Sequence, residues 1–210
     1  MIIRKLFKFE GSHIVRNCSS SRCKFSRHGH SYKVEVFFTA DSLDNGGMIM
    51  DFGLMKNTIK DLIDSFDHAE SIWCKDQLAV EQAECLSERY IIMPVTPSAE
   101  QYSLLFLFII DKIIRATIFN NGEKNVRVHS VKVHETDTGY AQAFANDLYM
   151  VNYNLKNIIF SDGIKQEWKS PTMFDDLIES DRTGIPCFEN PVVDQQIEIS
   201  HDERELDVID

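Results

Sequence analysis

Residues 28–39 read HGHSYKVEVFFT, and this stretch decides the fold. From residue 32 onward its apolar side chains alternate with more polar ones, so that Tyr32, Val34, Val36 and Phe38 share one face. A period of two residues is that of a β-strand with one buried face. Residues 32–39 therefore predict a strand that lays this face on a hydrophobic core.

Three further strands are expected around it. Residues 2–9 have the composition of a strand, and so do residues 126–135, whose alternation slips near His129 in the way that is typical of a β-bulge. The turn signal Asn45-Gly46-Gly47 predicts that residues 48–52 pair back as the second arm of a hairpin. These elements together predict an antiparallel sheet.

Helical periodicity appears twice. Apolar residues spaced by three and four predict one helix over residues 54–66. A second helix is expected to begin with Thr96 as its cap and Pro97 as its first residue, and to run through the apolar stretch 104–110. Two helices on one face of an antiparallel sheet give an α+β fold.

Charge divides the chain near residue 150. The whole chain carries a net charge of -11, and residues 151–210 hold 14 acidic and 5 basic side chains, which leaves only -2 for residues 1–150. We therefore expect a compact domain over residues 1–150 and an acidic C-terminal extension over residues 151–210 that is partly disordered. Apolar side chains in the extension, among them Trp168 and Phe174, leave a docking role open.

Composition also argues against several kinds of partner. An acidic chain lacks the surplus of Lys and Arg that nucleic-acid phosphates require. No stretch reaches the roughly 18 to 20 apolar residues of a membrane helix, and the N-terminus has no apolar secretory segment. The odd number of cysteines, five, fits reduced thiols. We expect a cytoplasmic protein that binds neither nucleic acid nor membrane.

His28 and His30 form the strongest local signal for chemistry. Side chains two apart in an extended chain point the same way, and Gly29 between them adds no bulk. Imidazole suits zinc, and catalytic zinc sites often combine three protein ligands with one open position. His13, at the end of the first strand, is the nearest candidate for the third ligand. An H-x-H pair also occurs without any metal, so the pattern alone leaves both interpretations open.

Two candidates for proton transfer accompany these histidines. Cys23 lies five residues before His28 among basic residues, which favours the thiolate form, and Cys18 in the same loop competes for the same role. Asp67 and His68 can orient one another for proton transfer if the preceding helix ends near residue 66. A zinc-ligating or inert cysteine and an ordinary helix-end histidine would give the same pattern.

Two carboxylates complete the candidate set. Glu135 is expected at the end of a strand, where a carboxylate can accept two hydrogen bonds from an aminopyrimidine edge. Glu100 falls in the expected first turn of the second helix, where a carboxylate is favourable for electrostatic reasons alone. An exposed surface glutamate would look the same in both places.

In this order, the motifs resemble the 6-pyruvoyl-tetrahydropterin synthase / 6-carboxy-tetrahydropterin synthase family. No single piece is diagnostic, whereas the ordered set, which spans roughly residues 1 to 145, is highly specific. The matching pieces are Phe9-Glu10-Gly11-Ser12-His13, Cys23 with His28-Gly29-His30-Ser31-Tyr32, Gly47-Met48-Ile49-Met50-Asp51-Phe52, Phe66-Asp67-His68, Pro97-Ser98-Ala99-Glu100 and His134-Glu135-Thr136.

The resemblance implies a T-fold, in which an antiparallel sheet carries two helices on one face. Subunits of such proteins assemble into an oligomeric barrel, commonly a homohexamer built as a dimer of trimers, with the active sites at subunit interfaces. The implied substrate is 7,8-dihydroneopterin triphosphate. The implied roles are Zn²⁺ binding by His13, His28 and His30, general base for Cys23, a partner relay for Asp67 and His68, and binding of the pterin ring by Glu135, with help from Glu100.

The resemblance leaves the product open. Our first expectation is 6-carboxy-tetrahydropterin, formed with loss of triphosphate and acetaldehyde for the synthesis of queuosine and other 7-deazapurines. The alternatives are a 6-pyruvoyl-tetrahydropterin synthase of the tetrahydrobiopterin route and a non-catalytic pterin-binding protein. Cys23 argues against a folate-related branch, which typically carries glutamate in its place.

Three features depart from the family pattern. Four residues separate Cys23 from His28, a spacing between those of the two main branches, so it neither settles the product nor excludes Cys18 as the base. Residues 69–95 form a longer segment than is typical, which could alter an interface or the rim of the pocket. The acidic extension has no counterpart that the sequence alone can place.

Overall fold

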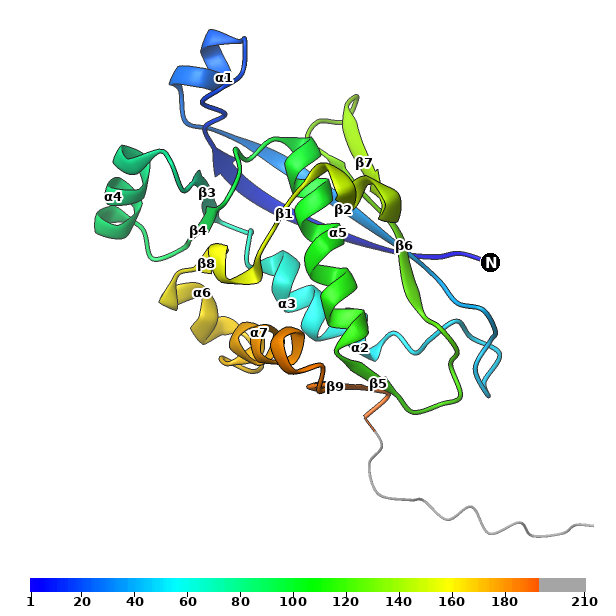
Figure 1. The fold of residues 1–210 in the computed structure, drawn as a ribbon. Helices are drawn as coiled ribbons and strands as arrows, with labels where there is room; N and C mark the ends of the chain where they lie inside the picture. Colours follow the sequence, from blue (N-terminus) through cyan, green and yellow to red (C-terminus); the bar gives the residue numbers. More distant parts are fainter. Residues whose placement is uncertain (193–210) are drawn as a thin grey trace, which may run out of the picture.

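A seven-stranded sheet forms the frame of the molecule in this computed structural model, which describes residues 1–192. Its strands follow the order β7-β6-β2-β1-β3-β4-β8 (Figure 1). A separate two-stranded sheet pairs β5 with β9. The strands are β1 (Ile3–His13), β2 (His28–Thr39), β3 (Ala69–Trp73), β4 (Tyr90–Met93), β5 (Thr117–Phe119), β6 (Arg127–His134), β7 (Tyr140–Phe144), β8 (Ile159–Phe160) and β9 (Phe188–Asn190).

The strand predicted over residues 32–39 is part of β2, an interior strand of this sheet between β6 and β1. Tyr32, Val34, Val36 and Phe38 are all buried on one face of β2, which confirms the predicted alternation. The slip near His129 is also confirmed. Phe37 pairs with Ser130 and Phe38 pairs with Val128, so His129 is the extra residue of a bulge in β6.

The sheet is mixed rather than wholly antiparallel. β1, β2, β6 and β7 pair in the predicted antiparallel sense, whereas β3 runs parallel to β1 and to β4. The helix α4 (Gln77–Leu86) connects β3 to β4. Such a crossover returns the chain to the same edge, so the two strands must run in the same direction. The long segment 69–95 therefore adds two strands to the sheet.

The predicted second arm of a hairpin over residues 48–52 is wrong. The Asp44 carboxylate accepts hydrogen bonds from the backbone N–H groups of Gly46 (2.9 Å) and Met48 (2.8 Å). Side-chain bonds of this kind offer the backbone an alternative to a strand ladder. Residues 48–52 form an irregular loop instead, and Ile49 and Met50 are buried in the core.

The helix predicted over residues 54–66 is divided in two. α2 (Gly53–Lys56) and α3 (Thr58–Asp64) meet at Asn57, whose φ of -111° and ψ of -101° lie outside the helical region. The buried residues of both helices still face the core, so the apolar period is continuous across the break. Periodicity therefore identified the buried face and missed the backbone irregularity.

The second predicted helix is α5 (Ala99–Arg115), and its start differs by two residues from the prediction. Ser98 is the cap, because its side-chain oxygen accepts the N–H of Gln101 at 3.4 Å. Thr96 and Pro97 lie outside the helix. The consequence is functional, since the Pro97 carbonyl is free to accept a hydrogen bond from a histidine of the site described below.

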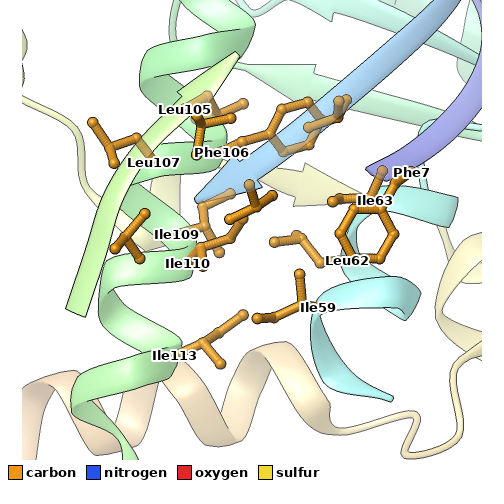
Figure 2. Packing of buried hydrophobic residues seen from close by; sticks show 14 of the residues in the cluster. Phe7, Ile59, Leu62, Ile63, Leu105, Phe106, Leu107, Ile109, Ile110 and Ile113 are labelled. Carbon is orange, nitrogen blue, oxygen red and sulfur yellow. The ribbon is translucent and has the colours of Figure 1, made fainter. Parts of the chain in front are cut away.

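Two helices cover one face of the sheet, as predicted. Figure 2 shows Ile59 and Leu62 of α3 facing Ile109, Ile110 and Ile113 of α5 across the core. Each of these side chains is at most 1% exposed. Burial of one such aliphatic side chain contributes about 1.5–3 kcal/mol, so this layer fixes the helices to the sheet.

The C-terminal extension packs on the same core as far as residue 192. α6 (Asp162–Glu167) and α7 (Met173–Thr183) lie at the end of the molecule opposite to the short helix α1 (Ser21–Phe25) (Figure 1). Trp168 and Phe174, which the sequence left open for docking, belong to the central hydrophobic cluster. Two 3₁₀ helices, Ala145–Met150 and Leu155–Asn157, lead into the extension.

Three sequence-based expectations concern the domain division, the cysteines and membrane-spanning helices. The division into a compact domain over residues 1–150 and a partly disordered extension over residues 151–210 stays a prediction, and residues 193–210, with the acidic end, lie outside the described residues. All five cysteines are free thiols. Within residues 1–192, no helix has both the length and the apolar character needed to cross a membrane.

Candidate metal centre and active site

Three histidines converge where β1 and β2 meet. The antiparallel register places His13 directly opposite His28, and His30 lies two residues farther along β2. One ring nitrogen from each histidine lies within 4.8 Å of the other two. The three residues that the sequence grouped therefore form one cluster, and the strand pairing explains why His13 completes it.

Backbone carbonyls orient two of the three rings. His13 Nδ1 donates to the Pro97 carbonyl at 2.5 Å, and His28 Nδ1 donates to the Ser26 carbonyl at 3.0 Å. These bonds leave the Nε2 atoms as the unprotonated positions of the neutral rings. The two Nε2 atoms lie 3.1 Å apart and face one another. Second partners of this kind are typical of metal-ligating histidines.

His13 is held in its neutral form. Its side chain is fully buried, and burial lowers the pKa of His13 to about 4, against the opposing effect of the Pro97 carbonyl. A neutral imidazole offers a lone pair to a cation at physiological pH, as metal binding requires.

The cluster fits a zinc ion in number, type and spacing of ligands. Two Nε2 lone pairs that face one another at 3.1 Å repel unless a cation lies between them. Ligands of a tetrahedral zinc ion, each 2.0–2.1 Å from the metal, are about 3.3 Å apart. Three imidazoles leave a fourth position for a substrate or water, which is the pattern of catalytic rather than structural zinc.

A cavity of about 800 Å³ opens beside the cluster. His28 and His30 form part of its wall, and His13 lies buried behind them. The lining includes the candidate residues Cys18, Cys23, Glu100 and Glu135, together with Arg22, Ser26, Ser98 and Tyr140. The volume is that of a small-molecule site.

Both candidate cysteines face this cavity. Cys18 Sγ donates a hydrogen bond to the Ser20 carbonyl at 3.1 Å, an interaction that requires the protonated thiol. Cys23 lies on α1, between Arg22 and Lys24. Since the thiolate is the reactive form, the contact of Cys18 favours Cys23 as the base.

The two glutamates reach the cavity from different elements. Glu135 follows β6, and its Oε1 atom lies 3.7 Å from His13 Nε2 and 3.9 Å from His30 Nε2. Glu100 lies in the first turn of α5 and lines the same cavity. A carboxylate at each position can bind a polar edge of a ligand next to the metal ligands.

Asp67 and His68 pair with one another outside this cavity. α3 ends before them, and His68 Nδ1 donates to Asp67 Oδ2 at 2.8 Å. Burial opposes ionisation of Asp67, yet hydrogen bonds from the Glu10 N–H and from His68 keep the pKa of its carboxyl below the ordinary value. Asp67 is therefore a carboxylate that can hold the ring of His68.

The pair lines two cavities other than the Cys23 cavity. His68 borders a cavity of about 740 Å³ together with Arg27, Glu70 and His30. Asp67 and His68 together border a smaller cavity with Lys8 and Asp64. His30 is the residue that the first of these shares with the Cys23 cavity. One chain thus brings Cys23, the glutamates and the histidines together, but not the Asp67–His68 pair.

Sequence reasoning missed the groups that orient the ligands. The Pro97 and Ser26 contacts are made by main-chain carbonyls, which any residue type supplies, so no sequence signal identifies them. It also missed Arg89, which contacts the turn that carries Asp67. Only the three-dimensional path of the chain reveals these groups.

Comparison with known proteins gives a consistent result. The sequence model of the family described as 6-pyruvoyl tetrahydropterin synthase matches residues 2–146. A protein of Helicobacter pylori strain J99 named 6-carboxy-5,6,7,8-tetrahydropterin synthase is 41% identical over 195 residues, which cover 90% of this chain and 95% of that protein. A protein of the same name from Aquifex aeolicus is 32% identical over 159 residues, covering 67% of this chain and 95% of that one.

These coverages bear on the C-terminal extension. A match over 90% of the chain must continue far beyond residue 146, so the Helicobacter protein has a counterpart of the extension. The expectation that the extension has no counterpart is therefore corrected. The Aquifex protein matches over nearly its whole length and yet covers only two thirds of this chain, so the extension is not common to all proteins of that name.

A solved structure supports the fold. An uncharacterised protein of Wolinella succinogenes superimposes with a TM-score of 0.56 over 69% of this chain and 98% of its own, at 21% sequence identity. The α+β T-fold predicted from the sequence is confirmed.

Proposed function

Because the chain belongs to the 6-pyruvoyl tetrahydropterin synthase family, we propose that it is a zinc-dependent lyase that makes 6-carboxy-5,6,7,8-tetrahydropterin. The substrate would be 7,8-dihydroneopterin triphosphate, one water would be consumed, and triphosphate and acetaldehyde would leave. The product serves the synthesis of queuosine and other 7-deazapurines. The free thiols of all five cysteines are compatible with work in the cytoplasm.

One observation carries the proposal. A three-histidine cluster with an open side adjoins a cavity that also holds a thiol and two carboxylates. Relatives with 41% and 32% identity bear the name of this synthase, and the Helicobacter match extends through almost the whole chain. These names favour the carboxy product over the pyruvoyl product, which the spacing of Cys23 and His28 left open.

His13, His28 and His30 would hold the zinc, which would supply Lewis-acid chemistry to the oxygens of the substrate side chain. Cys23 would remove a proton from the substrate side chain as general base. Glu135, beside the ligands, would accept hydrogen bonds from the pterin ring and fix its position before reaction. Glu100 would assist at the ring from the start of α5.

Asp67 and His68 would relay the proton from a second copy of the chain. The pair and Cys23 line different cavities of one chain, so a single site containing both requires another subunit. We therefore propose an assembly with sites at its interfaces, a homohexamer built as a dimer of trimers. Symmetric oligomers repeat such an interface around the ring.

Mixing of two inactive variants tests the shared site. Cys23→Ala and His68→Gln chains, each inactive alone, are mixed, exchanged in mild denaturant and reassembled. If Cys23 and His68 of one site come from different chains, about a quarter of the sites in a random mixture are intact, and turnover recovers accordingly. Turnover of the mixture is compared with each variant treated in the same way. No recovery in a mixture with proven subunit exchange would contradict the proposed interface.

Product analysis tests the activity itself. The zinc-loaded protein is incubated anaerobically with 7,8-dihydroneopterin triphosphate, and the products are identified by mass spectrometry. We expect 6-carboxy-tetrahydropterin and acetaldehyde in equal amounts. Formation of the pyruvoyl compound would identify the chain as a 6-pyruvoyl-tetrahydropterin synthase that uses the same site residues. Unchanged substrate from folded, metal-loaded protein would favour a non-catalytic pterin-binding protein.

A further inference from the structure

The turn that carries Asp67 and His68 has a strained backbone. His68 has a φ of 50°, in the left-handed region that side-chain-bearing residues rarely adopt. Its N–H donates to the Glu10 carbonyl at 2.7 Å, and the Glu10 N–H donates to Asp67 Oδ1 at 2.7 Å. Such a conformation persists only where surrounding contacts determine it, so the groups that hold this turn bear on the geometry of the pair.

Arg89 binds the turn from outside the helix. Its Nε atom donates to the Asp67 carbonyl and its Nη2 atom donates to the Asp64 carbonyl, both at 3.0 Å. These carbonyls lie at and just beyond the end of α3, where the helix leaves acceptors without internal partners. The planar guanidinium presents its donors in a fixed fork, so two contacts from one side chain fix the spacing of the two carbonyls.

Three consecutive residues of the C-terminal extension complete the arrangement. Glu167 Oε2 lies 2.5 Å from Arg89 Nη1, as an ion pair without the angles of a hydrogen bond. The Trp168 indole N–H donates to Ser65 Oγ at 2.8 Å, and both residues are buried. The Lys169 N–H donates to Asp61 Oδ2 at 2.9 Å. All three contacts fall on the last turn of α3 or on the arginine that binds it.

We propose that Arg89, Glu167, Trp168 and Lys169, here named the α3 clamp, are positioning residues for the Asp67–His68 pair. The inference rests on the proposed function, in which that pair relays a proton. It gives the C-terminal extension a role in catalysis that the smaller relative from Aquifex must fulfil by other contacts. None of the four residues lines the Cys23 cavity, whereas Arg89 and Glu167 line cavities that the Asp67–His68 pair borders, so the clamp lies on the side of the site that carries the pair.

The clamp contacts contribute unequally to the positioning of the pair. Glu167 is largely exposed, with 65% of its side chain open to solvent, and exposed ion pairs contribute little. Arg89 is only 19% exposed, and the bond between Trp168 and Ser65 is buried. We therefore assign most of the positioning to Arg89 and Trp168, and a smaller share to Glu167.

A purely structural role for the extension makes a different prediction. α7 is tied to α5 by the ion pair of Asp181 with Lys112 at 2.6 Å, and neither residue lines a cavity that the Asp67–His68 pair borders. If the extension only stabilises the fold, loss of this ion pair and loss of a clamp contact lower kcat equally whenever they lower the free energy of unfolding equally. If the clamp positions the relay, only clamp variants affect turnover.

Arg89→Lys is the decisive variant, with Asp181→Asn as its matched control. Lysine keeps the positive charge and loses the fork, so we expect kcat for 7,8-dihydroneopterin triphosphate to fall about tenfold to a hundredfold. KM should change by less than about threefold and the zinc content should stay the same, because a relay acts in the chemical step. Asp181→Asn should leave kcat unchanged. Trp168→Phe, which removes the indole donor together with part of a buried ring, should lower kcat by an intermediate factor.

Amide hydrogen exchange measured by mass spectrometry provides a readout that does not need activity. The peptide containing residues 64–70 should exchange faster in Arg89→Lys than in the wild type, and at the wild-type rate in Asp181→Asn. If Arg89→Lys does not fold, kcat and hydrogen exchange of Glu167→Ala and Trp168→Phe are compared with those of Asp181→Asn instead.

Two results would overturn the clamp. One is a folded Arg89→Lys protein with wild-type kcat and unchanged exchange of the 64–70 peptide. The other is an equal loss of kcat in Arg89→Lys and Asp181→Asn at equal thermal stability. A wild-type protein without turnover would refute the proposed function instead, and hydrogen exchange alone would then decide whether Arg89 holds the turn.

Discussion

Substitution of His28 by alanine is expected to abolish zinc binding and to lower kcat/KM by about a thousandfold or more. A metal that stabilises developing charge contributes several kcal/mol to the transition state, and each 1.36 kcal/mol is a factor of ten in rate. His28 is the ligand of choice because it is partly exposed, whereas His13 is fully buried and its removal would leave a cavity in the core. Zinc content is measured by mass spectrometry of the metal, and turnover by product formation.

A second histidine on the same sheet serves as the control. His129 lies at the bulge of β6, where its Nδ1 atom contacts Ser130 Oγ. His129→Ala removes an imidazole without touching the cluster, so zinc content and turnover should stay at the wild-type level. A His28→Ala protein that retains one zinc per chain and full turnover would refute the assignment of the ligands.

The response to metal removal distinguishes a catalytic from a structural ion. Structural zinc contributes folding free energy, so chelation of such an ion unfolds the protein. Here His13 packs against Tyr32 and Tyr102 at one end of the core, but the apolar cluster formed by α3, α5 and the sheet is continuous without the three imidazoles. Chelated protein should therefore keep its circular dichroism spectrum while turnover is lost.

The histidine cluster could be predicted because it depends on short-range geometry. A period of two places His28 and His30 on one face of β2, and the register of the β1–β2 pair then places His13 opposite His28. The alternation that buries Tyr32, Val34 and Val36 fixes this register, because a slip by one residue would turn all these side chains to solvent. The fold and the metal cluster follow from the same pattern.

Other parts of the site depend on long-range contacts and could not be predicted. The Pro97 carbonyl reaches His13 across 84 positions of sequence, and it is available only because α5 begins at Ala99 rather than at Pro97. Arg89 reaches the Asp67 turn from the end of α4 and the start of β4. No local propensity encodes either contact.

Charge and apolar spacing point in different directions in the extension. Its negative charge predicts partial disorder, which stays a prediction for the extension as a whole, whereas within the described part Trp168, Phe174 and Leu177 are each at most 5% exposed and lie in the central cluster. A few large apolar side chains, correctly spaced, are sufficient to dock an acidic segment, since their burial outweighs repulsion between exposed charges that solvent screens. The average charge of a segment is therefore a weaker guide than the spacing of its largest apolar residues.

Cys23→Ala is expected to lower kcat by about a thousandfold while zinc content and pterin binding persist. Loss of a general base costs roughly 10²–10⁴ in rate, and Cys23 is absent from the metal cluster of His13, His28 and His30. Alanine also removes little volume from a side chain that faces an open cavity, so the fold should be preserved. Turnover is measured by product formation, and binding by the quenching of pterin fluorescence.

Cys18→Ala provides the matched control, because both thiols line the same cavity. The Cys18 thiol donates its proton to a hydrogen bond with the Ser20 carbonyl, so its loss should change kcat by less than about threefold. The reverse pattern, with full turnover in Cys23→Ala and none in Cys18→Ala, would transfer the role of base to Cys18. Loss of activity in Cys23→Ala together with loss of zinc would instead make Cys23 a fourth ligand, and the metal site would then be closed rather than catalytic.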